Sequence, residues 1–321
     1  MSLPPAIVFI LSCLVLVIAG SLLVKSFSRL ACFLRMSEFV LAFVIMAFST
    51  SLPELVVSVK AAAEGVPALA LGNVIGSNVA DLTLVAGIAA ILGKGLRPTS
   101  KLIRTDAYWM VAISTLTVAL MHIGRQVSRL DGIILICTFL VYIAYMFKRR
   151  KGYPLVLKES GTRWEVIGHT LLIPISLAAL FYSAGFVVES GSELALSLAL
   201  PPIFVGLFFI ALGTSLPELV FECKSVLAGH SGLALGDLIG SVIVNSTIVL
   251  GIAAIITPIT GNIFLFMTSS FFMIVVCFMF AVMLETEGKI SWKEGVILLM
   301  MYVLFLMVEF SLKQFYIVNG I

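Results

Sequence analysis

Long apolar stretches separated by short polar connectors run through the whole 321-residue chain. A helix that crosses a bilayer needs roughly 20 consecutive, mostly apolar residues, and windows of that length give about ten candidates. The predicted spans cover residues 4–24, 37–64, 66–92, 105–122, 130–147, 166–188, 202–228, 231–257, 263–284 and 295–312. The pattern therefore predicts an all-α integral membrane protein of about ten transmembrane helices.

Composition supports a bilayer rather than water as the main solvent. Hydrophobic residues make up 61% of the chain and charged residues 12%, too few for a solvated globular surface. The formal net charge is only +3 and offers no basic face, so we expect no nucleic-acid partner. The five cysteines stand singly, without a CxxC motif, and indicate neither a Cys/His metal site nor a cofactor. The first apolar stretch has no basic residue before Lys25, and we expect it to be retained as a span.

The chain repeats itself. The segment from Thr50 to Val56, T-S-L-P-E-L-V, recurs letter for letter at residues 214–220, an offset of 164. The same offset carries residues 70–77 onto 234–241 without a gap. A polar connector at 148–163 separates two groups of five spans, so we expect a first repeat at 1–147 with its motif at 47–81 and a second at 164–321 with its motif at 211–245. Because each repeat has an odd number of spans, the second must be inverted relative to the first.

Lysine and arginine predict the orientation. With the N-terminus outside, 16 of these residues fall on the cytoplasmic side and 4 outside, as the positive-inside rule requires. We therefore expect a multi-pass protein of the plasma membrane with a cytoplasmic 148–163 loop. Its basic run at 148–151 would lie near anionic lipid.

Two acids stand inside predicted spans. Glu54 and Glu218 each follow a proline, and an acidic residue at membrane depth is costly unless something compensates its charge. Proline removes one helical N–H donor and displaces the carbonyl four residues before it, which leaves backbone oxygens available near both acids. Such oxygens are tolerated within a membrane where they line a cavity or bind an ion.

Helical spacing brings further oxygens to the same faces. Positions three, four and seven residues apart share one face of a helix. The first repeat offers Ala47, Thr50, Ser51 and Glu54, then Ser77 and Asp81; the second offers Ala211, Thr214, Ser215 and Glu218, then Ser241 and Asn245. Oxygen ligands without nearby histidine or cysteine suit Na⁺ or Ca²⁺.

The two T-S-L-P-E segments, with G-N-V-I-G-S-N and G-D-L-I-G-S downstream, resemble the α-repeats of the sodium/calcium exchanger family, prokaryotic type, within the calcium/cation antiporters. The resemblance implies calcium binding by Glu54, Glu218 and the carbonyls of Thr50 and Thr214. It implies sodium sites at the carbonyls of Ala47 and Ala211 and at Ser51, Ser77, Ser215 and Ser241, with Asp81 and Asn245 as a central pair. Prokaryotic members commonly have Asn in the first repeat and Asp in the second, so this pair is exchanged here. Potassium-dependent relatives have Asp where Asn245 stands, which favours potassium independence.

Three other polar residues receive weaker predictions. Asn73 and Asp237 are expected in glycine turns, as structural or pathway-lining residues. Glu222 has Ser58 as its counterpart, and we expect it at a span end beside water or a cation, without a role.

We expect a sodium/calcium antiporter that exports Ca²⁺ by alternating access, with Ca²⁺ and Na⁺ as substrates, no cofactor and no obligatory protein partner. The alternative is a proton-coupled, or other-cation-coupled, calcium or divalent cation antiporter on the same scaffold, which Asp81 keeps open. Inverted repeats with broken helices favour a transporter over a channel. We expect no enzyme, because prolines and hydroxyls accompany the two acids rather than a water-activating aspartate pair.

Overall fold

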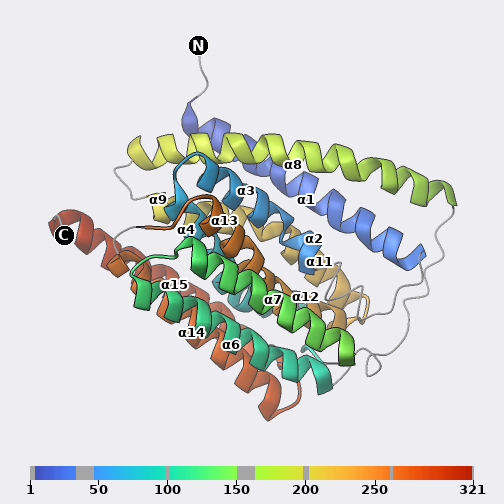
Figure 1. Ribbon diagram of the computed structural model, residues 1–321. Helices are drawn as coiled ribbons and strands as arrows, with labels where there is room; N and C mark the ends of the chain where they lie inside the picture. Colours follow the sequence, from blue (N-terminus) through green and yellow to red (C-terminus); the bar gives the residue numbers. More distant parts are fainter. Residues whose placement is uncertain are drawn as a thin grey trace.

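The computed structural model describes residues 4–33, 47–98, 101–149, 163–197, 202–260 and 263–319. These residues are almost entirely helical, and the part described contains no β-strand beyond two isolated bridges. Figure 1 shows the helices as one elongated bundle in which most of them run roughly along its length. The prediction of an all-α membrane protein is confirmed.

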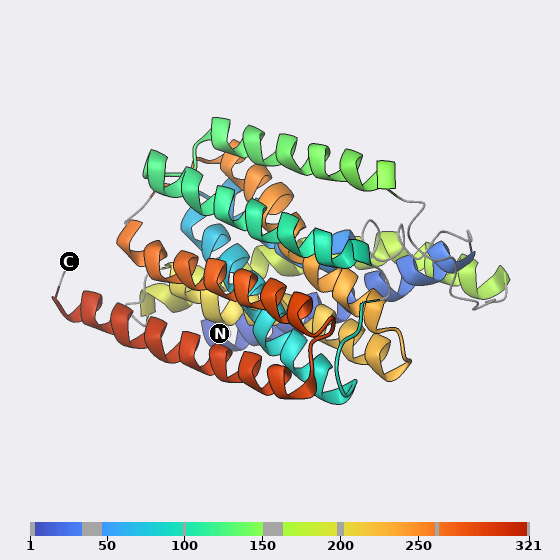
Figure 2. The same ribbon diagram turned by 90° about the horizontal axis from the view of Figure 1, so that it is seen from below.

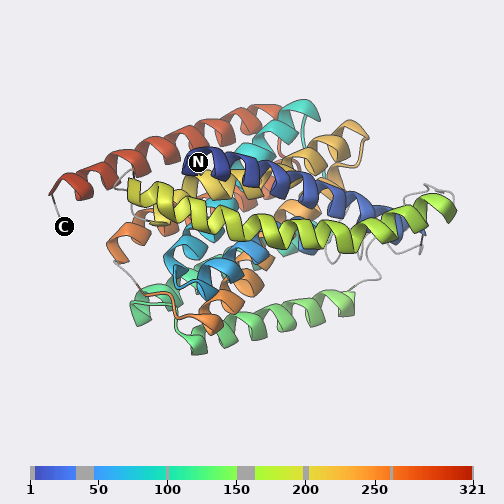
Figure 3. The ribbon, with the colours of Figure 1, turned by 90° about the horizontal axis from the view of Figure 1, so that it is seen from above.

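Two long helices cover one face of the bundle. α1 (Pro5–Phe33) and α8 (Arg163–Ser197) lie side by side, as Figures 1 and 3 show from two directions. Gly20 of α1 faces both motif prolines, because an added Cβ would meet Pro217 at 3.0 Å and Pro53 at 3.1 Å. α1 therefore crosses over the equivalent point of both repeats.

Four further helices lie away from the α1–α8 pair. They are α6 (Lys101–Gly124), α7 (Arg129–Arg149), α14 (Ile263–Thr286) and α15 (Trp292–Asn319). Figure 2 shows them along the outside of the bundle. α6 packs against α14, α7 packs against α13, and α15 packs against α5. Each of these three contacts joins a helix of one repeat to a helix of the other. The two repeats are therefore interlocked rather than separate domains.

The central elements follow the sequence repeat to the residue. The first half contains α2 (Ala47–Thr50), α3 (Leu52–Ala63), α4 (Pro67–Ala80), η2 (Asp81–Val85) and α5 (Ala86–Leu92). The second half contains α9 (Pro202–Phe204), η4 (Val205–Ile210), α10 (Ala211–Thr214), α11 (Leu216–Leu227), α12 (Ser231–Val244), η5 (Asn245–Val249) and α13 (Leu250–Ile256). Each element from α10 to α13 begins and ends 164 residues after its counterpart among α2 to α5.

Loop pairing shows directly that the halves are inverted. Leu96 bridges to Ile290, and Val127 bridges to Ile259. Leu96 and Val127 lie beyond opposite ends of α6, so the two bridges mark opposite ends of the bundle. The offset of 164 takes the loop around Leu96 to the loop around Ile259, which lies at the other end. The same connection therefore faces opposite sides in the two repeats.

Eight helices within the described residues are long and apolar enough to cross a membrane, and a ninth span is Val205–Thr214 with Leu216–Leu227, bent by 40°. The predicted span at 37–64 begins with residues 37–46, which lie outside the described part, as do residues 150–162 of the predicted connector. The other predicted spans coincide with helical segments, but three of them end too early. The predicted 4–24 continues to Phe33, 166–188 continues to Ser197, and 295–312 continues to Asn319.

Candidate functional site

A break in each central helix positions the two motif acids. α2 ends at Thr50 and α10 at Thr214, and the helices resume at Leu52 and Leu216 after one intervening serine. Proline follows at the second position of each new helix, where its missing N–H costs little. Glu54 and Glu218 therefore stand in the first turn of α3 and α11. Carboxylates are favoured there by the positive end of the helix dipole.

The acids of the two halves come together in the interior. Glu54 is 0% exposed and Glu218 is 1% exposed. Glu54 acts electrostatically on Glu218 and on Asp81, although they belong to different elements. The structure therefore brings into one buried region the carboxyl groups that the sequence places 164 residues apart.

Threonine hydroxyls link the halves reciprocally. Thr50 Oγ1 lies 3.0 Å from Ser241 Oγ, and Thr214 Oγ1 lies 3.3 Å from Ser77 Oγ. Each serine belongs to the repeat opposite its threonine, so each oxygen group is assembled from both halves. Ser77 Oγ also donates to Glu54 Oε1 at 3.4 Å, which joins this group to an acid.

Backbone carbonyls accompany the hydroxyls. The Ala47 carbonyl accepts the Ser51 N–H at 3.3 Å and lies 3.3 Å from Thr50 Oγ1. The Ala211 carbonyl accepts the Ser215 N–H at 3.0 Å and lies 3.2 Å from Thr214 Oγ1. The region around each break is thus rich in oxygen atoms from both backbone and side chain.

Many of these buried oxygens have no hydrogen donor. Within the described residues, no hydrogen bond of normal length and angle involves Ser51 Oγ, Ser215 Oγ, Glu54 Oε2, either carboxyl oxygen of Glu218 and Asp81, or the Oδ1 and Nδ2 atoms of Asn245. A buried polar atom without a partner costs about 1–3 kcal/mol, and a charged one costs more. A cation held among these oxygens would remove that cost.

All twelve predicted ion ligands lie in the interior. None of them is more than 3% exposed, and they belong to the broken helices and to the helices that follow. The described residues contain no compact cluster of three or more histidine, cysteine or acidic side chains with the spacing of a metal site. Hydroxyl and carbonyl oxygens would therefore have to join the carboxyl groups in coordinating any ion held here.

Asp81 and Asn245 begin equivalent irregular turns. Each opens a five-residue π-helical segment, η2 and η5, and single π turns within α-helices are frequent at functional sites. Hydrogen bonds between uncharged residues hold the backbone beside η5 in place. Asn78 Nδ2 donates to Ser246 Oγ at 2.8 Å, and Thr117 Oγ1 donates to the Ser246 carbonyl at 3.1 Å.

Two expectations about neighbouring polar residues are wrong. Glu222 does not lie at a span end beside water, because it stands within α11 and its side chain is 0% exposed. Asn73 and Asp237 lie within α4 and α12 rather than in turns. The signal for Glu222 and Asp237 was present in the offset, which pairs them with neutral Ser58 and Asn73, but no pattern along the chain places Glu222 against α12.

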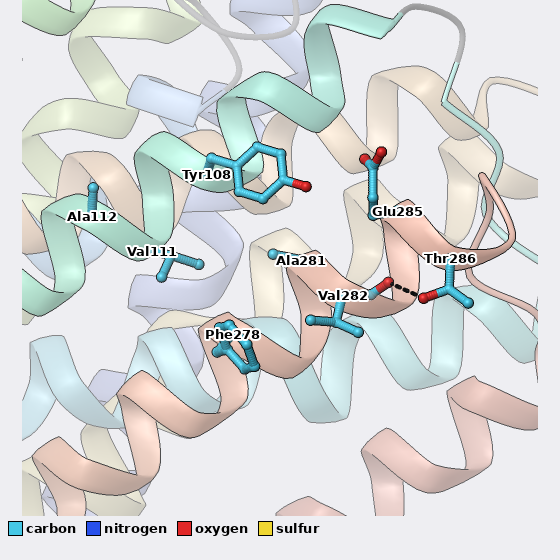
Figure 4. A pocket seen from close by; sticks show the side chains of 8 residues that line it. All are labelled: Tyr108, Val111, Ala112, Phe278, Ala281, Val282, Glu285 and Thr286. Carbon is cyan, nitrogen blue, oxygen red and sulfur yellow. Dashed lines mark hydrogen bonds between the residues drawn. The ribbon is translucent and has the colours of Figure 1, made fainter.

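An apolar pocket of about 320 Å³ lies elsewhere, between α6 and α14. Figure 4 shows Tyr108, Phe278 and Glu285 around it, and the Thr286 hydroxyl donating to the Val282 carbonyl within α14. None of the predicted ion ligands lines this pocket.

Known proteins share this organisation. The model of the family described as sodium/calcium exchanger protein matches residues 5–148 and 168–310. The sodium/calcium exchanger MaX1 of Methanosarcina acetivorans is 28% identical over 95% of this chain and 98% of its own length. The putative antiporter CaxA of Alkalimonas amylolytica is 31% identical over 79% of this chain and 81% of its own length, and the inner membrane protein YrbG of Escherichia coli is 30% identical over 76% and 75%.

The fold is also similar to that of a solved exchanger. A structure of the sodium-calcium exchanger NCX_Mj superposes with a TM-score of 0.69 at 24% identity, covering 95% of this chain and 98% of that chain. The family model covers both repeats, and each matched segment contains one of the two broken helices described above. This chain belongs to the sodium/calcium exchanger family.

Proposed function

We propose that this protein exchanges sodium for calcium across the membrane, with Ca²⁺ held between Glu54 and Glu218. The observation that carries the proposal is the pair of buried carboxyl groups, one from each inverted half, with three of their four oxygens lacking a hydrogen donor in the described structure. Family membership supports the coarser statement, a cation antiporter of the calcium-transporting class.

Charge balance supports a cation as the bound species. An isolated charge within a membrane costs at least about 2.5–3.5 kcal/mol, and several acids close together add mutual repulsion. Among the described residues, ion pairs join Arg104 to Glu285 and Lys289 to Glu287, away from the site. A divalent ion, or several sodium ions, would neutralise the central acids instead.

The ligand types support calcium and sodium as the exchanged ions. Carboxylate, carbonyl and hydroxyl oxygens are the ligands of hard cations. The paired hydroxyls of Thr50, Ser241, Thr214 and Ser77 flank the acids on both sides, which suits monovalent ions bound beside a divalent site. The relative MaX1 and the structural neighbour NCX_Mj are both named sodium/calcium exchangers.

Exchange follows from the cost of an empty site. Carboxyl groups that repel one another in a low-dielectric interior disfavour conversion between outward-facing and inward-facing states until an ion neutralises them. An occupied protein therefore converts more readily than an empty one, and ions move in one direction only when others return. Sodium entering down its gradient would expel calcium.

The orientation belongs to the same proposal. The N-terminus lies outside, the 148–163 connector is cytoplasmic, and calcium leaves the cell across the plasma membrane. The connections after α5 and α11 then face the cytoplasm.

Calcium uptake into sodium-loaded proteoliposomes tests this function. The wild-type protein takes up ⁴⁵Ca²⁺ when the outside medium lacks sodium, and uptake stops when sodium is equal on both sides. Glu54→Gln, which keeps the side-chain shape but removes the charge, abolishes uptake. Glu64→Gln alters an exposed acid at the end of the same helix, α3, and keeps it. Uptake that ignores the sodium gradient would refute the coupling.

Proton coupling is the second candidate, favoured by the fully buried Asp81 carboxyl group beside Glu54. Replacing sodium by choline at fixed pH separates the two functions. Sodium coupling predicts loss of uptake in choline, and proton coupling predicts uptake that follows an imposed pH gradient.

A further inference from the structure

A second pair of buried acids lies beside the proposed calcium site, in one repeat only. Glu222 of α11 and Asp237 of α12 are both 0% exposed, and their carboxyl groups lie close enough to share a hydrogen. Their counterparts at the offset of 164 are Ser58 and Asn73. The pair is therefore a departure from the internal symmetry of the site.

Hydrogen bonds between neutral groups satisfy the matching positions of the first repeat. Asn73 Nδ2 donates to Ser58 Oγ at 3.2 Å and to the Glu54 carbonyl at 3.4 Å, while Asn73 Oδ1 accepts the Thr214 hydroxyl at 3.2 Å. An amide facing a hydroxyl supplies both donors and acceptors. No ligand is needed between these two side chains.

The second repeat lacks donors at the same place. Thr50 Oγ1 donates to Asp237 Oδ1 at 3.3 Å, but within the described residues nothing donates to Asp237 Oδ2 or to either oxygen of Glu222. Two carboxylates can only accept hydrogen bonds. When both groups are ionised, three fully buried carboxylate oxygens are therefore left without a hydrogen donor among the described residues.

No basic side chain of the described structure compensates the pair. Lys224 belongs to the same helix, α11, but lies exposed on its surface, and the ion pairs of Arg104 and Lys289 involve other acids. The nearest charged neighbours add to the problem, because Asp237 also acts electrostatically on Glu54, Asp81 and Glu218. Ionisation of these buried carboxyl groups would therefore require a positive partner.

We propose that Glu222 and Asp237, with the Thr50 hydroxyl, hold a second divalent cation of the calcium class next to the central site. Two carboxylates match the charge of one divalent ion, and their four oxygens with the hydroxyl supply most of the oxygen ligands that such an ion takes. The inference deepens the proposed function and rests on it, because the ion would be calcium on its way to or from Glu54 and Glu218.

The pair lies on only one of the two approaches to the central acids. Glu222 lies one helical turn beyond Glu218 towards Leu227, where α11 ends, and Asp237 lies one turn before Ser241, on the side of α12 where that helix begins. The pair therefore stands between the central acids and the connection at 228–230, which faces the cytoplasm in the orientation proposed above. The opposite approach passes the neutral Ser58 and Asn73. Calcium would be concentrated on one approach only.

Ion counting on the purified protein tests the second site. Equilibrium dialysis with ⁴⁵Ca²⁺ in sodium-free buffer is expected to give about two ions per chain for the wild type. Glu222→Ser with Asp237→Asn gives the second repeat the residues of the first, and about one ion is expected to remain. Glu54→Gln is expected to lose the central ion and to keep the other.

These outcomes separate the two proposals. A wild type that binds about one ion, unchanged in the Ser/Asn double variant but lost in Glu54→Gln, overturns the second site and leaves the central one intact. No loss of bound ion in Glu54→Gln overturns the central site instead. Infrared spectroscopy gives a second test. The proposal is overturned if calcium-saturated wild type keeps a band of a protonated carboxyl group that the double variant lacks, because the pair then shares a proton instead of binding an ion.

A further variant guards against misfolding. Glu222→Gln with Asp237→Asn preserves side-chain volume, and the N–H groups of one new amide can donate to the oxygen of the other. This variant is expected to elute as the wild type does in size-exclusion chromatography. Its loss of about one bound ion then reports the missing ligands. An unchanged count in this folded variant contradicts the proposal.

Discussion

From α2 to α5 and from α10 to α13, the two repeats agree in backbone to the residue and differ in charge at three matched buried positions. The first repeat has Ser58, Asn73 and Asp81 where the second has Glu222, Asp237 and Asn245. Every described helix boundary from α2 to α5 is nevertheless reproduced from α10 to α13. Backbone symmetry here depends on the prolines and glycines that both repeats share, whereas charge depends on side chains that can change without moving a helix. A symmetric scaffold therefore surrounds an asymmetric electrostatic field.

The largest effect is expected where the repeats are the same. Glu54→Gln and Glu218→Gln each remove one of two matched acids, and loss of one partner from a buried charged site costs about 3–5 kcal/mol. We expect each variant to slow sodium-dependent calcium uptake by at least about 100-fold, since 1.4 kcal/mol is about tenfold. Comparable losses in both support equivalent roles. A variant that retains near wild-type uptake would remove its acid from the site.

The next effect tests the crossing of the repeats. A Cβ on Gly76 of α4 would meet the Leu207 carbonyl, and one on Gly206 of η4 would meet the Leu69 carbonyl. A glycine of each repeat is therefore in close contact with the backbone of the other repeat. Overpacking of this kind costs about 1–3 kcal/mol. Gly76→Ala and Gly206→Ala should both lower the thermal unfolding midpoint in detergent. Gly168→Ala, in an open position on α8, should not, and equal stability of all three variants would contradict the close crossing.

Exchange of Asp81 and Asn245 sharpens the comparison further. We expect Asp81→Asn to reduce calcium uptake about tenfold, because one acid of the central group is lost. Adding Asn245→Asp returns a carboxyl group to the equivalent turn in η5 and should recover most of the activity. Failure of this rescue, with normal folding of the double variant, would show that the two positions do not face the same ion.

The smallest effect distinguishes the two threonines. Thr50 donates to the Asp237 carboxyl group, and Thr214 donates to the Asn73 amide oxygen. Hydrogen bonds to charged groups contribute about 1.5–3 kcal/mol, compared with about 0.5–1.5 kcal/mol for neutral ones. Thr50→Val should therefore lower the unfolding midpoint more than Thr214→Val does. The reverse order would mean that Asp237 carries no charge in the folded protein.

The sequence alone determined the architecture and the central residues. Apolar segments of bilayer length predicted the helices, and an exact seven-residue repeat at an offset of 164 predicted the inverted halves and the paired acids. These features are readable because they are local or periodic: apolar length, proline within a helix and residue spacing act on the chain where they occur.

Only the tertiary structure decided which side chains meet. The crossed bonds of Thr50 with Ser241 and of Thr214 with Ser77 join residues far apart in the chain, and no spacing rule predicts them. The burial of Glu222 was missed for the same reason. Its helix could be read from the sequence, but whether that face meets water or Asp237 depends on how α11 packs against α12. Packing sets the dielectric and the partners of a charge, and these decide whether an acid is solvated or must hold an ion.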